Sequence, residues 1–133
     1  MAQLRRVLMV VRDVAKTAEF YTSGLGLNTL AASDATAMPD KAFAELELNA
    51  ETSLVLTTAT QEVFTCTGYS PILTFTMPPS ELDTRLYALL AKGAILDGPL
   101  KHELYGKIAS LRTPDGHMIT LFEPSATAAS LRR

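Results

Sequence analysis

The chain has 133 residues, of which 47 % are hydrophobic and 20 % charged, and its formal net charge is -2. This length suits one domain with a proper core rather than two, and the composition excludes a disordered chain. The charge, without a basic stripe, argues against a nucleic-acid partner, and no apolar run approaches the roughly 18 residues of a membrane-spanning helix.

The first half of the chain predicts a strand, a helix and then further strands. The β-branched, apolar run 7–11 indicates a buried strand, and Asp13 suits the N-cap of a helix. Apolar residues then recur on one face of that helix, and Gly24 and Gly26 mark its end. This stripe consists of Val14, Ala18, Tyr21 and Leu25.

Two alternating segments close the first half. Residues 31–41 lack a period and indicate a loop, with a short strand near Leu30 as an alternative. Segments 43–48 and 53–58 alternate as half-buried strands do, and the turn-like residues 49–51 join them.

The second half repeats this order. A strand over 72–77 ends at Pro78 and Pro79, and Ser80 is the predicted N-cap of the next helix. Gly93 suits the end of that helix. Its apolar stripe consists of Leu82, Leu86, Leu89 and Leu90.

A loop with Gly98, Pro99 and Gly106 precedes the last predicted hairpin. The hairpin consists of strands 107–113 and 117–122 around the turn 114–116, and residues 125–133 form a tail. The apolar stretch after Arg5 and Arg6 ends within a few residues at Arg12 and Asp13, which argues against a cleaved secretory signal, so we expect a cytoplasmic protein. The lone Cys66 cannot form an intrachain disulfide.

A shift of 65 residues superimposes the two hairpins. It places Leu46 on Leu111 and Leu54 on Ile119, and the hydrophobic alternation stays in phase. We therefore predict one domain, 1–133, of α+β class, made of two βαβββ modules at 4–65 and 70–124. A single module leaves one sheet face bare, so two modules should pair to bury or enclose that face, with a ligand cavity between them.

Two motifs make the chain resemble the vicinal oxygen chelate family, the glyoxalase, bleomycin-resistance and extradiol dioxygenase type of fold. They are Val10-Val11-Arg12-Asp13 with Phe20-Tyr21 and Leu25-Gly26-Leu27, and the run 113–119, in which Thr113 replaces the usual Asp. The resemblance covers residues 4 to 124. It implies paired βαβββ modules whose curved mixed sheets enclose a pocket, often in a homodimer.

Enzymes of this family place metal ligands on the concave sheet face. The matching positions here hold Arg6, Val55, Thr120 and Ile72, the last with Leu73 or Thr74 as alternatives if the register slips. An arginine has no lone pair to offer, and the apolar and threonine side chains are poor ligands. We therefore predict no metal and no other cofactor.

Strand alternation then gives the candidate ligand-binding residues. On each strand, the residues that alternate with the metal-ligand positions are apolar and should pack under the helices. They are Val7, Met9, Val11, Leu54, Leu56, Leu73, Phe75, Ile119 and Leu121. The candidates, to which two loop residues are added, are Arg6, Leu8, Val10, Ser53, Val55, Thr57, Ile72, Thr74, Thr76, His102, Tyr105, Met118, Thr120 and Phe122.

These candidates have plainer interpretations too. Thr and Val are good strand formers, so the face could simply close the module interface. Arg6 would pair with a ligand carboxylate or phosphate, or else lie solvated at a strand end. Glu45 and Glu47 are expected to face solvent rather than the pocket.

The leading functional hypothesis is a metal-free, bleomycin-resistance-like protein that binds a small organic molecule in a cavity between its modules. No catalytic residue can be named. The first alternative is a lyase, isomerase or dioxygenase. It would be metal-dependent through unexpected ligands such as His102 with Glu45 or Glu47, or it would use metal-free acid-base chemistry through a carboxylate. The second is a non-catalytic interaction module.

Overall fold

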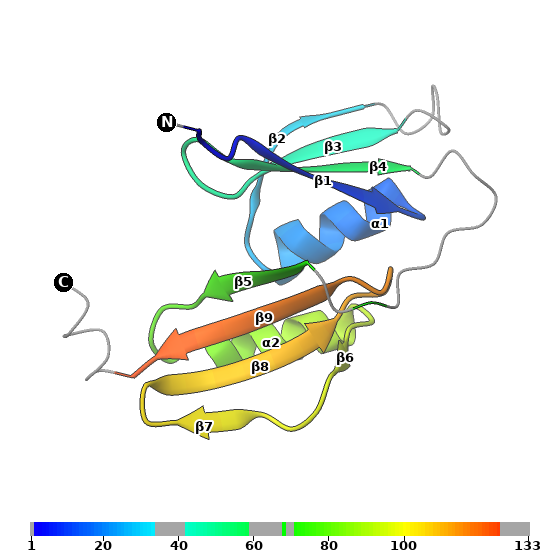
Figure 1. The fold of residues 1–133 in the computed structure, drawn as a ribbon. Coiled ribbons are helices and arrows are strands. Elements are labelled where there is room, and N and C mark those ends of the chain that lie inside the picture. The colour runs from blue at the N-terminus through cyan, green and yellow to red at the C-terminus, as the bar shows by residue number, and fades with distance from the viewer. Residues whose placement is uncertain (1, 34–41, 59–67, 69–70, 126–133) are drawn as a thin grey trace. The chain divides into compact units, whose positions relative to one another are not determined.

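The computed structural model describes residues 2–33, 42–58, 68 and 71–125. The chain divides into two compact units, Met1–Phe64 and Thr65–Arg133, each of which is described here by itself (Figure 1). Cys66 and most of the predicted loop 31–41 lie outside the described residues. Within the described residues, no helix is long and apolar enough to cross a membrane.

Unit 1 is a four-stranded sheet with a helical segment packed on one face (Figure 1). The strand order is β1-β4-β3-β2, and β1 runs parallel to β4 while the other neighbours are antiparallel. The elements are β1 (Arg6–Val11), α1 (Val14–Glu19), the π-helical η1 (Phe20–Gly24), β2 (Asn28–Ala32), β3 (Phe43–Glu47) and β4 (Ser53–Thr58).

Unit 2 repeats this plan with five strands. The order is β5-β9-β8-β6, with β7 also paired to β8, and β5 runs parallel to β9. Helix α2 contacts β9. The elements are β5 (Ile72–Thr76), α2 (Leu82–Ala91), β6 (Ile95–Leu96), β7 (Lys101–Glu103), β8 (Gly106–Arg112) and β9 (Met118–Pro124).

The strand registers confirm the repeat predicted from the sequence. Leu46 pairs with Leu54 in unit 1, and Leu111 pairs with Ile119 at the equivalent position in unit 2. All four leucine and isoleucine side chains are fully buried. The fold is therefore two βαβββ modules, as predicted.

The apolar faces under the helices form the core of each unit. In unit 1, Asp13 caps α1 as predicted, because its Oδ1 accepts a hydrogen bond from the Lys16 N–H at 3.1 Å. Tyr21 is fully buried, and its hydroxyl donates to Met9 Sδ at 3.6 Å. The predicted helix stripe is therefore a core stripe, although its second half is π-helical over Phe20–Gly24.

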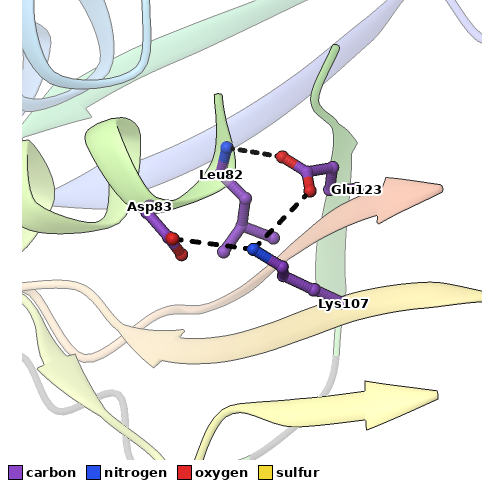
Figure 2. Close-up of polar contacts among 4 residues, drawn as sticks. All are labelled: Leu82, Asp83, Lys107 and Glu123. Carbon is purple, nitrogen blue, oxygen red and sulfur yellow. Dashed lines mark hydrogen bonds and ion pairs between the residues drawn. The ribbon is translucent and has the colours of Figure 1, made fainter. Parts of the chain in front are cut away.

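The predicted cap of α2 is wrong. Ser80 has a φ of 69°, and the N-cap position is Glu81 instead. The Glu81 side chain makes no capping hydrogen bond. Instead, the Leu82 N–H donates to Oε1 of Glu123 on β9 at 3.0 Å, as Figure 2 shows. A carboxylate distant in sequence therefore satisfies the first amide of the helix.

Lys107 on β8 completes this arrangement. Its Nζ lies 3.9 Å from Oε2 of Glu123 and 3.5 Å from Oδ2 of Asp83 (Figure 2). Only 11 % of the Glu123 side chain is exposed. The cluster joins the start of α2 to β8 and β9, which fixes the helix on this face of the sheet.

The loop predicted over 94–106 contains two short strands, β6 and β7. Gly98, at a φ of 90°, and Pro99 lie between these two strands. The equivalent segment of unit 1 is the single strand β2. The short strand near Leu30 is observed as β2, with a register irregularity between Thr29 and Ala31. Of the predicted tail, only Ser125 is described, and its N–H donates to the Tyr105 carbonyl at 2.7 Å.

Candidate functional site

Each sheet has one face under its helix and one face that carries the other side-chain parity. We call the second the bare face of its unit. Residues paired directly across neighbouring strands point to the same face, so the registers define both bare faces. On β1, β3 and β4 of unit 1 it consists of Arg6, Leu8, Val10, Phe43, Glu45, Glu47, Ser53, Val55 and Thr57, and β2 adds Asn28 and Ala31.

Two rows of side chains run across the bare face of unit 1. Leu8, Val55 and Glu45 lie in one row, because Leu8 pairs with Val55 and Val55 with Glu45. Arg6, Ser53 and Glu47 lie in the next row. Leu8 is 65 % exposed, so a large apolar side chain is presented beside polar groups.

Three polar side chains in these rows contact one another. The Ser53 hydroxyl donates to Oε2 of Glu45 at 2.6 Å, and Nε of Arg6 lies 3.7 Å from the same oxygen. The Arg6 side chain is 66 % exposed and that of Glu45 is 26 % exposed. We call Arg6, Glu45 and Ser53 the polar cluster. Arg6 is thus a largely exposed arginine at the start of β1 that pairs with Glu45.

The bare face of unit 2 is built in the same way. On β5, β8 and β9 its residues include Ile72, Thr74, Thr76, Ile108, Ser110, Arg112, Met118, Thr120 and Phe122. The short strands β6 and β7 add Ile95, Lys101 and Glu103. The three residues from edge strand β5 are exposed, whereas Met118 is buried. Arg112 is used structurally: its Nη1 donates to the Gly116 carbonyl at 2.6 Å and the Gly68 carbonyl at 3.2 Å.

The structure places twelve of the predicted site residues on the two bare faces, six in each unit. The two loop candidates differ from them. His102 lies on edge strand β7 rather than in a loop, and Tyr105 lies in the turn before β8. Both are exposed. The predicted cavity between the modules stays a prediction, because the units are described separately.

The structure also shows which residues the sequence interpretation missed. Glu45 and Glu47 are half-buried and share the bare face with Val55 and Ser53, so they lie on the same face as the predicted site residues. Phe43 joins them on the same strand. The signal was the hairpin register, which fixes the face of Glu45 once Leu46 is paired with Leu54.

The residues at the family's metal-ligand positions do not suit a metal. The parallel registers make Arg6 and Ile72 equivalent, since they pair with Ser53 and Met118, which are also equivalent. Val55 is paired with Leu8, and Thr120 with Thr74. Protein sites for divalent ions are built mainly from carboxylate, imidazole or thiolate donors, and these side chains supply none of the three. In the part of the chain that is described, no three His, Cys, Asp or Glu residues could hold a metal together.

Comparison with known proteins matches this fold to one superfamily. The family model described as Glyoxalase/Bleomycin resistance protein/Dioxygenase superfamily matches residues 3–121. A search of curated proteins finds no match.

Solved structures give the same picture. TnmS3, an antibiotic binding protein from Streptomyces sp. CB03234, is 26 % identical, with a TM-score of 0.62 over 94 % of this chain and 98 % of that chain. A glyoxalase-related enzyme from Fulvimarina pelagi is 19 % identical, with a TM-score of 0.74 over 92 % and 88 % of the two chains. The fosfomycin resistance protein FosX from Listeria monocytogenes is 15 % identical, with a TM-score of 0.72 over 96 % and 98 %.

Proposed function

The chain belongs to the Glyoxalase/Bleomycin resistance protein/Dioxygenase superfamily, and from this premise we propose that it binds a small organic molecule against the bare sheet faces of its units. The observation that carries this proposal is the composition of those faces. Each combines apolar side chains such as Leu8 and Ile72 with hydroxyl groups such as Thr74. Ligand sites typically have mainly apolar walls and a few polar groups that fix orientation.

An antibiotic or a comparable natural product is the proposed ligand class. The similar Streptomyces protein is an antibiotic binding protein, and its 26 % identity extends over 94 % of this chain. Burial of apolar ligand surface would supply roughly 25 cal/mol per Å² of binding energy. The hydroxyl groups of the faces would orient the ligand.

We propose further that the protein needs no metal for this binding. The support is the donor set described above, in which Val55 and Thr120 occupy positions where a carboxylate would be required. Thermal unfolding with and without Zn²⁺, Mn²⁺ and Ni²⁺ tests this point. A metal that raises the unfolding temperature at stoichiometric concentration would contradict it.

The family resemblance also supports a homodimer, and the lone Cys66 supports a cytoplasmic location. We therefore propose a cytoplasmic homodimer. Light scattering over a range of concentrations tests the first, with a monomer at all concentrations as the contrary result. Fractionation of the source cells tests the second.

A thermal-shift screen of natural-product antibiotics tests ligand binding directly. A ligand at 100 times its Kd should stabilise the folded protein by about 2.7 kcal/mol. Leu8→Asp introduces a charge on the bare face and should weaken binding at least about tenfold, because the carboxylate loses hydration when the ligand covers it. Leu8 is exposed, so the variant should fold.

Tyr87→Asp is the matched control. Tyr87 lies on α2 and is 70 % exposed, close to the 65 % of Leu8, but it is not on a bare face. This variant should bind the hit as the wild type does. A hit whose stabilisation is the same in Leu8→Asp and Tyr87→Asp, and in a matching Thr74→Asp variant of unit 2, would contradict binding at the bare faces.

A further inference from the structure

The polar cluster of unit 1 leaves part of its hydrogen-bonding capacity unused. Both contacts of the Glu45 carboxylate, from Ser53 and from Arg6, go to Oε2. Among the described residues, no hydrogen bond or ion pair to Oε1 is observed. The carboxylate therefore offers one acceptor oxygen on the bare face, held in orientation by the Ser53 hydroxyl.

Arg6 has unused donors beside that oxygen. Its contact with Glu45 is made through Nε, whereas a guanidinium carries five N–H donors in a planar fork. The described residues offer the terminal nitrogens no other partner. Since 66 % of the Arg6 side chain is exposed, these donors are accessible.

The cluster therefore presents an acceptor and a donor side by side. We propose that it recognises a neutral group that both donates and accepts hydrogen bonds, of which an amide is the simplest example. An amide N–H would donate to Oε1 of Glu45, and the amide carbonyl would accept from a terminal nitrogen of Arg6. This inference rests on the proposed small-molecule binding and specifies the ligand group for the face of unit 1.

The opposite charges of the pair favour a neutral group over an ion. A carboxylate that approaches Arg6 also approaches Glu45, and a cation that approaches Glu45 also approaches Arg6, so each ion meets repulsion as well as attraction. A neutral group that both donates and accepts hydrogen bonds avoids this repulsion and can still bond to both side chains. Glu47, in the same row as Ser53, adds a further negative charge to the face, so a cationic probe belongs in the test.

Apolar side chains adjoin the cluster. Val55 and Leu8 share the row of Glu45, and Phe43 precedes it by two residues on the same face of β3. Leu8 is 65 % exposed and Phe43 is 40 % exposed. An amide attached to an aromatic or aliphatic body would thus find polar and apolar contacts on one surface.

Four probes of one size separate the possible recognition modes: benzamide, benzoate, benzamidinium and toluene. Each is titrated into the ¹⁵N-labelled full-length protein, and the amide shifts of β1, β3 and β4 are followed. For the wild type, benzamide should bind most tightly and perturb the rows that contain Arg6 and Glu45. Benzamide binding no tighter than that of toluene, or weaker than that of either ion, would overturn the inference.

Two variants should redirect the preference. Glu45→Leu removes the acceptor, so benzamide binding should weaken at least about tenfold, the loss expected for a hydrogen bond to a charged group. Arg6 then has no counter-charge in the cluster, and benzoate should become the preferred probe. Arg6→Met should instead favour benzamidinium.

Glu81→Gln is the control, because Glu81 lies in unit 2 at the start of α2, where its side chain caps nothing. It should keep the wild-type order of probes, and a well-dispersed spectrum shows that each variant is folded. Unchanged probe preference in both Glu45→Leu and Arg6→Met would overturn the inference. If toluene perturbs the bare faces while benzamide has no advantage, small-molecule binding survives and only the amide preference fails. If no probe perturbs the bare face of unit 1, the amide inference fails, and the screen of natural-product antibiotics decides the proposed function.

Discussion

At the scale of single residues, Glu123 has the clearest structural role. Its carboxylate accepts the Leu82 N–H at the start of α2 and lies 3.9 Å from Nζ of Lys107. The side chain is only 11 % exposed, so solvent replaces these contacts poorly if they are lost. A local cap from Ser80 was predicted because serine before a helix usually plays that part.

Replacing Glu123 should therefore destabilise the protein. We expect Glu123→Ala to lower the free energy of unfolding by about 2 kcal/mol, since it leaves a buried amide without its acceptor. Asp83→Ala is the control, because the Asp83 side chain is 56 % exposed and its loss removes only an ion pair with Lys107. Its cost should be less than about 1 kcal/mol. Urea denaturation measures both, and equal losses would contradict the helix-capping role of Glu123.

The polar cluster shows what residue patterns leave undetermined. Arg6 was predicted on the pocket-facing parity, but its ion pair with Glu45 depends on which strands are neighbours. β3 and β1 are separated in the sheet by β4, and Ser53 of β4 contacts Glu45 between them. No spacing within one segment encodes a contact across three strands.

At the scale of elements, the sequence predicted the paired strands better than the irregular ones. The alternation around Leu46 and Leu54 returns around Leu111 and Ile119, and this repetition determined both registers. β6 and β7 were missed because they have two and three residues, too few to show a period of two. η1 was read as α-helix because a π-helical turn preserves the apolar face of Phe20 and Tyr21.

Gly106 offers a test of the close pairing between β8 and β9. Its φ is 150°, and an added Cβ would collide with the backbone of Glu123 and Pro124. Because backbone cannot move aside as a flexible side chain does, Gly106→Ala should lower the free energy of unfolding by at least about 2 kcal/mol.

Gly98→Ala is the matched substitution, since Gly98 also has a positive φ, of 90°, but has open space around the position of a Cβ. Only the conformational strain remains there, so we expect a cost of about 1 kcal/mol. Thermal or urea unfolding compares the two. If Gly106→Ala costs no more than Gly98→Ala, the strands tolerate a wider separation than the structure indicates.

At the scale of the whole molecule, the main question is what each bare face is for. The sequence allowed two interpretations, a binding surface or a face closed by packing. The two interpretations predict different effects of substituting Leu8. This side chain is 65 % exposed, whereas Met9 and Val11 on the same strand are buried. An open surface tolerates polar substitution, whereas a packed one does not.

We therefore expect Leu8→Asp to change the free energy of unfolding by less than about 1 kcal/mol. At a ligand concentration 100 times the wild-type Kd, it should lower the stabilisation by the ligand from about 2.7 to about 1.4 kcal/mol or less. Leu54→Ala sets the scale for packing, because Leu54 is fully buried under α1 and its truncation should cost about 3 kcal/mol. Urea denaturation with and without the ligand measures both effects. If Leu8→Asp alone costs as much as Leu54→Ala, the face is buried in the folded protein and holds no ligand. A binding surface predicts a small loss in the free energy of unfolding together with reduced stabilisation by the ligand. Leu8 would then contribute energy only when a ligand covers it.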